Sequence, residues 1–124
     1  MKKYDVLVLG WGKAGKTLAA KMAKQGKKVA IIEKDPKMYG GTCINVGCLP
    51  TKSLANSAHL IHEMTKLGLE RNYDINNAYF KKAMEEKIIL VNKLNNKNYG
   101  LLADNPNVDV YNGEAHFISN KEVK

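Results

Sequence analysis

What the sequence lacks already excludes two classes of protein. The chain has no run of about 18 apolar residues, so no segment of the sequence can form a transmembrane helix. The apolar stretch in residues 1–10 is too short for a secretory leader, and no small-residue cleavage site follows it. We therefore expect a cytoplasmic protein with no membrane partner, in a compartment where a structural disulfide is unusual and a catalytic one is not.

Arginine is almost absent. Of the 20 basic residues only Arg71 is an arginine, and the lysines are spread along the whole chain. A surface that follows nucleic-acid phosphates usually has clustered arginines together with aromatic residues that stack on bases. The net charge of +8 therefore indicates a positive surface that favours anionic cofactors and substrates, and we expect no nucleic-acid partner.

Cysteine is also scarce, and both cysteines, Cys43 and Cys48, lie in residues 40–52. A structural zinc site needs about four ligands. None of the three histidines makes a recognised spacing with the cysteine pair: His59, His62 and His116. We therefore expect no metal site. Two alternatives remain, a dithiol–disulfide pair that exchanges electrons and two unrelated small residues of the core.

The N-terminal third of the chain predicts a strand–helix–strand unit. Residues 6–9 form an unbroken apolar run, typical of a strand buried on both faces of a parallel sheet. Residues 13–24 predict a helix that Gly26 ends, and residues 29–32 predict a second strand that ends at Glu33. The apolar stripe of the helix is Ala14, Leu18, Ala19, Met22 and Ala23. The predicted fold class is α/β, with a Rossmann-like βαβ unit and a parallel sheet.

The rest of the chain predicts further helices and strands after a turn at Gly40 and Gly41. The expected elements are helices at 51–66 and 77–102 and strands at 108–111 and 115–118. A polar break at 70–77 separates the two helices. The two strands flank Asn112 and Gly113, a dipeptide favoured in tight hairpins, although their spacing is wide for a two-residue turn.

A glycine-rich loop joins the first predicted strand to the first helix. Gly10, Gly12 and Gly15 match the dinucleotide fingerprint G-x-G-x-x-G, which provides a tight turn, close approach to a pyrophosphate and close helix–strand packing. Extended to Lys16 and Thr17, the same residues also match the phosphate loop of NTPases. Either pattern alone is a weak signal, so the surrounding sequence has to decide between them.

That surrounding sequence favours the dinucleotide. Glu33 follows Gly10 by 23 positions, at the strand end where a carboxylate accepts hydrogen bonds from ribose hydroxyls. An NTPase also needs an apolar strand that ends in an aspartate for magnesium, and residues 108–110 are too short and too polar at their flanks to supply it. On this interpretation Lys16 and Thr17 are ordinary residues of the first helical turn with no catalytic task.

The cysteine spacing sets a geometric condition. In a regular α-helix, residues five apart have Cα atoms roughly 8–9 Å apart, whereas a disulfide needs about 4.4–6.8 Å. Cys43 and Cys48 can therefore pair only where the chain departs from a regular helix, and Gly47 and Pro50 favour such a departure. A helix that starts here also predicts a lowered thiol pKa, which favours the reactive thiolate.

Residues 40–52 resemble the redox segment of the flavin-dependent pyridine nucleotide–disulfide oxidoreductases, the family of glutathione reductase, dihydrolipoamide dehydrogenase and mercuric reductase. The glycine loop and Glu33 match the FAD site of that family, and the similarity extends over all 124 residues. Residues 12–18 and 38–41 look most like the bacterial members linked to reactive-chlorine resistance and copper(II) reduction. The resemblance implies electron flow from NAD(P)H through FAD to the cysteine pair, and then to a small-molecule disulfide or metal-ion substrate.

The same resemblance implies roles for individual residues. Gly10, Gly12 and Gly15 would pack against the FAD pyrophosphate, Glu33 would hold the adenosine ribose, and Gly41 and Thr42 would line the pyrophosphate and ribityl region. Cys43 would be the interchange thiol that meets substrate and Cys48 the charge-transfer thiol against the flavin. Lys52 would stabilise negative charge on the reduced ring. His59 and His62 would not be the catalytic base, which the partner subunit contributes in this family.

We expect residues 1–124 to be the N-terminal segment of a discontinuous FAD-binding domain. The sequence contains no second glycine fingerprint for NAD(P)H and no dimerisation domain. The parent enzyme is expected to be a homodimer, and this segment alone is expected to be inactive. The alternative function is a nucleotide-binding module or thiol redox sensor without turnover.

Overall fold

The structure is a computed structural model that describes residues 1–70 and 72–124. Its main sheet has three parallel strands. Its strands lie in the order β1 (Val6–Leu9), β2 (Val29–Glu33) and β3 (Val108–Asn112). In the register, Val8 lies beside Ile31, and Ile31 beside Val110, so the carboxyl ends of the three strands meet at one edge. The predicted α/β class with a parallel sheet is confirmed.

Two helices, α1 (Lys13–Lys24) and α4 (Tyr73–Ala103), pack against one face of this sheet. Alternate strand residues point to that face and join helix residues in the hydrophobic core. The core includes Val8, Ala19, Ala23, Val29, Ile31, Leu102 and Val108. On the other face Leu7 and Leu9 are 42% and 41% exposed. The prediction that β1 is buried on both faces was therefore wrong, because both helices lie on the same side.

Helix α1 has the predicted bounds, and Gly26 follows its C-cap residue Gln25 with φ +78°. Its buried face differs from the predicted stripe, because Ala14 and Leu18 are exposed. Gly15 lies against the sheet instead: a Cβ added there would be 2.7 Å from Val8 Cγ1. This close approach is the third task that the glycine fingerprint predicts.

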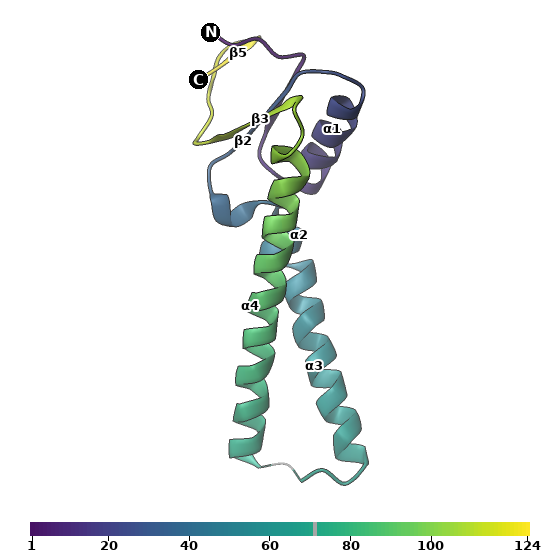
Figure 1. The fold of residues 1–124 in the computed structure, drawn as a ribbon. Helices are drawn as coiled ribbons and strands as arrows, with labels where there is room; N and C mark the ends of the chain where they lie inside the picture. Colours follow the sequence, from purple (N-terminus) through teal and green to yellow (C-terminus); the bar gives the residue numbers. More distant parts are fainter. Residues whose placement is uncertain (71) are drawn as a thin grey trace.

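The chain then forms η1 (Pro36–Met38), the short helix α2 (Thr42–Asn45) and the longer helix α3 (Cys48–Lys66). Figure 1 shows α3 and α4 as a helical hairpin that extends away from the sheet. Helix α3 begins three residues before the predicted 51, and α4 begins at Tyr73 rather than 77 because the Asn72 side chain accepts a hydrogen bond from Ile75 N. Of the predicted polar break, residues 73–77 are helical and Arg71 lies outside the described residues.

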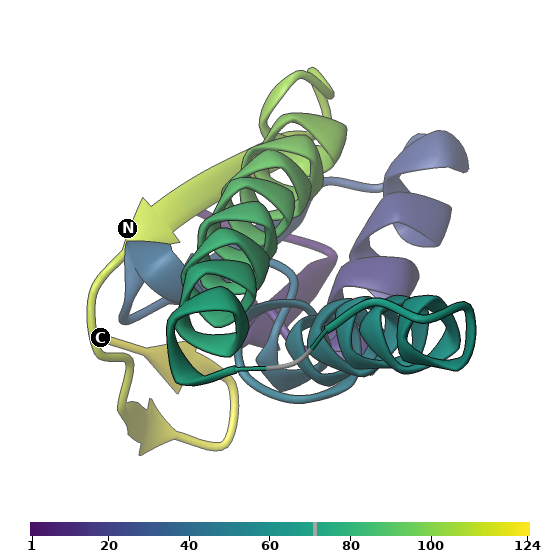
Figure 2. The same cartoon turned by 90° about the horizontal axis from the view of Figure 1, so that it is seen from below.

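The C-terminal segment forms a hairpin of β4 (Phe117–Ser119) and β5 (Glu122–Val123). Figure 2 shows it beside the three-stranded sheet, with both chain ends on this side of the molecule. The predicted strands around Asn112 and Gly113 do not pair with each other. Instead β3 pairs with β2, and Gly113 N donates to Glu33 O at 3.0 Å. Among the described residues, no helix is long and apolar enough to cross a membrane.

Candidate functional site

The glycine loop leaves the carboxyl end of β1 and leads into α1. Gly10 N donates to Ile32 O at 2.7 Å, which fixes the loop to the end of β2. A Cβ added to Gly10 or Gly12 would meet no atom within 4 Å, so the space in front of the loop is open. The first turn of α1 has no acidic residue and no side-chain cap, which leaves its N–H groups for an anion. The loop therefore has the room and the dipole that a pyrophosphate requires.

Glu33 lies beside the same loop at the end of β2 and is only 9% exposed. Its Oε2 accepts from Trp11 N at 2.7 Å, and its Oε1 accepts from Asp35 N at 3.1 Å. A carboxylate oxygen has more than one acceptor site, so each oxygen keeps capacity for a hydroxyl donor. The structure thus places Glu33 next to the loop, as predicted, and shows that it also anchors the loop backbone.

Trp11 is the central residue of an aromatic cluster that the sequence did not predict. Its side chain is fully buried, with ring centroids 4.7 Å from Tyr39 and 6.1 Å from Tyr99. The Tyr39 hydroxyl donates to Asn112 Oδ1 at 2.6 Å, and burial is the main cause that raises the pKa of this hydroxyl. The indole Nε1 has no hydrogen-bond partner among the described residues. The only signal in the sequence is a large aromatic residue inside a glycine loop.

Gly41 brings the cysteine segment against the glycine loop. Its φ is +76°, and a Cβ added there would lie 2.9 Å from Gly12 Cα and 3.3 Å from Trp11 O. Both the backbone conformation and the contact therefore require glycine. Thr42 follows as the first residue of α2 and is exposed. The structure brings Gly12 and Gly41 together from segments almost thirty residues apart in sequence.

The two cysteines lie on either side of a break between helices. Cys43 is in α2 and Cys48 begins α3, and between them Gly47 has φ −106° and ψ −94°, outside the helical range. The predicted departure from a regular helix is confirmed, and Pro50 is tolerated because it lies in the first turn of α3. Cys43 is half-buried and Cys48 exposed, and both are free thiols.

The electrostatics of Cys43 differ from the prediction. Hydrogen bonding to the Cys48 side chain, followed by burial, raises the pKa of the Cys43 thiol, whereas Lys13 and Lys16 act to lower it. The predicted lowering of the thiol pKa is therefore wrong for Cys43. The neighbouring thiol outweighs the two lysines in this dithiol form, because the hydrogen bond to Cys48 favours the protonated form of Cys43.

Helix α4 holds the cysteine segment through Asn95, which the sequence analysis missed, together with Asn45 of α2. Asn95 Nδ2 donates to Lys37 O at 2.9 Å and to Asn45 Oδ1 at 3.0 Å. Asn45 Nδ2 in turn donates to the carbonyls of Tyr39 and Gly41, both at 2.9 Å. These bonds satisfy backbone groups of the turn that leads into α2. No periodic pattern identifies Asn95, because it is one of many polar positions on a long helix.

Three other residues named from the sequence lie on α3. Lys52 is exposed and follows Cys48 by four residues, which is about one helical turn. His59 and His62 are also exposed and lie about three and four turns beyond Cys48. The structure therefore places Lys52 near the cysteine end of α3 and both histidines farther along the helix.

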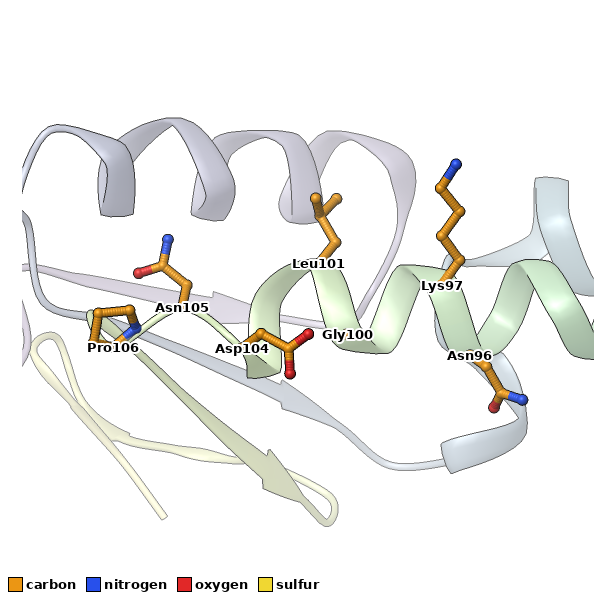
Figure 3. A pocket seen from close by; sticks show the side chains of 7 residues that line it. All are labelled: Asn96, Lys97, Gly100, Leu101, Asp104, Asn105 and Pro106. Atoms are coloured by element: carbon orange, nitrogen blue, oxygen red, sulfur yellow. The ribbon is translucent and has the colours of Figure 1, made fainter.

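A surface hollow at the end of α4 lies apart from these residues. It is lined by Asn96, Lys97, Gly100, Leu101, Asp104, Asn105 and Pro106. In Figure 3, Lys97 and Leu101 point to one side of α4 while Asn96 and Asp104 point elsewhere, so their polar groups do not converge. A binding site needs convergent polar groups, so this hollow is not the candidate site.

Comparison with known proteins adds to this geometry. The family model described as pyridine nucleotide-disulphide oxidoreductase matches residues 4–124. The chain is 45% identical over 124 residues to the probable pyridine nucleotide-disulfide oxidoreductase RclA of Escherichia coli (strain K12), covering all of this chain and 24% of that protein. It is 39% identical over 122 residues to the dihydrolipoyl dehydrogenase of Bacillus subtilis (strain 168), covering 97% of this chain and 25% of that protein.

A solved structure agrees with these matches. The Cu(II) complex of the HOCl-induced flavoprotein disulfide reductase RclA from Escherichia coli superposes with a TM-score of 0.82 at 44% identity. The match covers 99% of this chain and 24% of that one. The chain thus spans about a quarter of the length of the curated relatives it matches.

Proposed function

The chain belongs to the pyridine nucleotide–disulphide oxidoreductase family, in its RclA subfamily, and on that premise we propose that it forms part of a flavin-dependent disulfide reductase. One observation carries the proposal: Gly41 packs on Gly12 of the open glycine loop, and Cys43 follows only two residues later. A cofactor held by the loop and a thiol pair would therefore be neighbours. We further propose that residues 1–124 are the N-terminal segment of a discontinuous FAD-binding domain.

The residues around the loop fit FAD. The open space before Gly10 and Gly12 accepts a pyrophosphate, and the remaining acceptor capacity of Glu33 suits the adenosine ribose. We propose the roles that the family implies for the other residues. Gly15 would pack against the pyrophosphate, Gly41 and Thr42 would line the pyrophosphate and ribityl region, and Lys52 would stabilise negative charge on the reduced ring. When bound, FAD would supply electron pairs that NAD(P)H delivers as hydride.

The chain's own chemistry is thiol chemistry. In the dithiol form Cys43 and Cys48 together hold two electrons and two protons. With a disulfide substrate, the Cys43 sulfur bonds to one substrate sulfur and the other leaves as a thiol. Cys48 then displaces the bound sulfur, which leaves a Cys43–Cys48 disulfide and a second substrate thiol. With a metal ion such as Cu(II), the same dithiol would reduce two ions to Cu(I) and release two protons.

We also propose a substrate, an assembly and a location. The substrate would be a small-molecule disulfide or a metal ion, and the enzyme would be a homodimer in the cytoplasm. The net charge of +8 supports anionic ligands over cationic ones in general, so a metal substrate would have to bind through the thiols themselves. The Escherichia coli relative was solved as a Cu(II) complex, which supports testing copper first.

The proposal is tested on the full-length purified protein by its visible spectrum. A flavin spectrum, with a long-wavelength charge-transfer band after two-electron reduction, is expected. Cys48→Ser should abolish that band and keep the flavin absorbance, whereas His59→Gln, on the exposed side of α3, should change neither. A folded protein with no flavin spectrum and no NAD(P)H oxidation would support the alternative, a nucleotide-binding module or thiol redox sensor without turnover.

A further inference from the structure

Lys16 belongs to the phosphate-loop pattern that the proposed function does not use, and its side chain has a different partner. The residue lies at the end of the first turn of α1 and is half-buried. Its Nζ donates a hydrogen bond to Asn98 Oδ1 of α4. An NTPase lysine would reach the phosphates in front of its loop. Here the amino group is instead held by a residue of α4, more than eighty positions away in sequence.

Asn98 is built to hold that amino group in one place. Its side chain is only 8% exposed, and its Nδ2 donates to Leu94 O at 2.7 Å, which leaves Oδ1 for Lys16. A Cβ added to Gly40 would lie 3.1 Å from Asn98 Cγ and 2.8 Å from Ile44 Cγ1. The Asn98 amide, Gly40 and Ile44 therefore meet at one point. Because Ile44 follows Cys43 directly, the Lys16 amino group is held beside the cysteine segment.

The charges around Cys43 agree with this placement. The positive charges of Lys13 and Lys16 of α1 act to lower the pKa of the Cys43 thiol, whereas the Cys48 thiol of α3 raises it. The residues that α4 presents to this segment, Asn95 and Asn98, are neutral amides. Burial lowers the pKa of Lys16, and its interaction with Cys43 acts in the opposite direction. The charge of Lys16 therefore favours the thiolate of Cys43, in agreement with the position of its amino group beside the cysteine segment.

We propose that Lys16, held by Asn98, is a positioning residue that stabilises negative charge on the Cys43 sulfur. The inference rests on the proposed function for its purpose. In the exchange step the Cys43 thiolate forms a bond to a substrate sulfur, the substrate S–S bond breaks, and the negative charge passes to the leaving sulfur. A fixed cation beside Cys43 raises the fraction of thiolate that can begin this step.

The test measures the alkylation of Cys43 by iodoacetamide between pH 6 and 10, in the full-length reduced protein with Cys48→Ala. That background removes the other thiol of the pair, so Cys43 titrates without a coupled partner. Lys16→Gln should slow alkylation about threefold at pH 7, because the loss of one partly exposed neighbouring charge shifts the pKa of a thiol by about half a unit. Lys16→Arg should restore the rate, and Lys21→Gln, an exposed lysine on the same helix, should leave it unchanged.

An unchanged rate in Lys16→Gln, or an equal decrease in Lys21→Gln, would overturn the proposal. Lys16→Met serves as a second variant that keeps the packing of the stem if Lys16→Gln unfolds, and far-UV circular dichroism checks the fold of each protein. Alkylation needs neither flavin nor turnover. A failure here therefore counts against Lys16 alone, whereas a missing flavin spectrum counts against the proposed function.

Discussion

The backbone N–H of Trp11 donates a hydrogen bond to Glu33 Oε2 across 2.7 Å. This bond joins the glycine loop after β1 to the last residue of β2. The carboxylate therefore supports the loop before any ligand binds, and it has a structural task in addition to the ribose contact proposed for it. A change at Glu33 should affect the stability of the chain as well as its affinity for a dinucleotide.

Glu33→Gln should lower the free energy of unfolding by about 1–3 kcal/mol. The glutamine keeps one carbonyl acceptor, so its amide nitrogen faces either the Trp11 or the Asp35 N–H and leaves that donor unpaired. Urea unfolding followed by circular dichroism measures the loss. Glu114→Gln is the control, because Glu114 is exposed. Equal stability of the two variants would contradict the anchoring role of Glu33.

Gly41→Ala should destabilise the protein more than Gly68→Ala does. Both glycines have positive φ, +76° and +95°, so both substitutions carry the backbone strain of about 1–2 kcal/mol. Only at Gly41 would the new Cβ also collide with Gly12 Cα, at 2.9 Å, whereas nothing lies within 4 Å at Gly68. The difference between the two unfolding free energies measures the loop contact. A difference near zero would mean that the cysteine segment can shift away from the loop.

Trp11→Ala should reduce the free energy of unfolding by about 3–5 kcal/mol, because a fully buried ring leaves a cavity. Trp11→Phe should cost far less, since it keeps a ring against Tyr39 and removes an indole N–H that has no partner among the described residues. Chemical denaturation of both variants provides the comparison. If phenylalanine were as damaging as alanine, the indole N–H would have to bind a group that these residues do not supply.

Cys48→Ala should lower the pKa of Cys43. Hydrogen bonding to Cys48 is the largest cause that raises it, and after its removal Lys13 and Lys16 act with less opposition. The thiolate would then form at lower pH, so alkylation of Cys43 near pH 7 should become faster than in the reduced dithiol protein. Peptide mass spectrometry identifies which cysteine reacts. An alkylation profile that moves to higher pH in Cys48→Ala would contradict the predicted lowering of the Cys43 pKa.

Local sequence patterns predicted the elements that depend on near neighbours. The βαβ unit, the helix end at Gly26 and the break between Cys43 and Cys48 follow from periodicity and from glycine and proline. The errors concern distant partners. Nothing near Leu7 shows that one face of β1 is open, and the dipeptide at Asn112 does not reveal that β3 pairs with β2.

The same distinction applies to the candidate site. The glycines, Glu33 and the cysteines were predicted because their spacing is local to one or two segments. Asn95 and Asn98 were missed, because their role depends on where a 31-residue helix crosses the cysteine segment. The hydrogen bond between Lys16 and Asn98 could not be predicted for the same reason, since Asn98 lies on that distant helix.

The aromatic cluster has an optical consequence. Trp11 is the chain's sole tryptophan, and its ring lies between the glycine loop and the segment that leads to the cysteines. Tyr39 and Tyr99 are near enough to pass excitation energy to it. A bound flavin would absorb where an indole emits. The tryptophan fluorescence of this chain therefore reports from one place, the junction of the proposed nucleotide and thiol sites, without an added label.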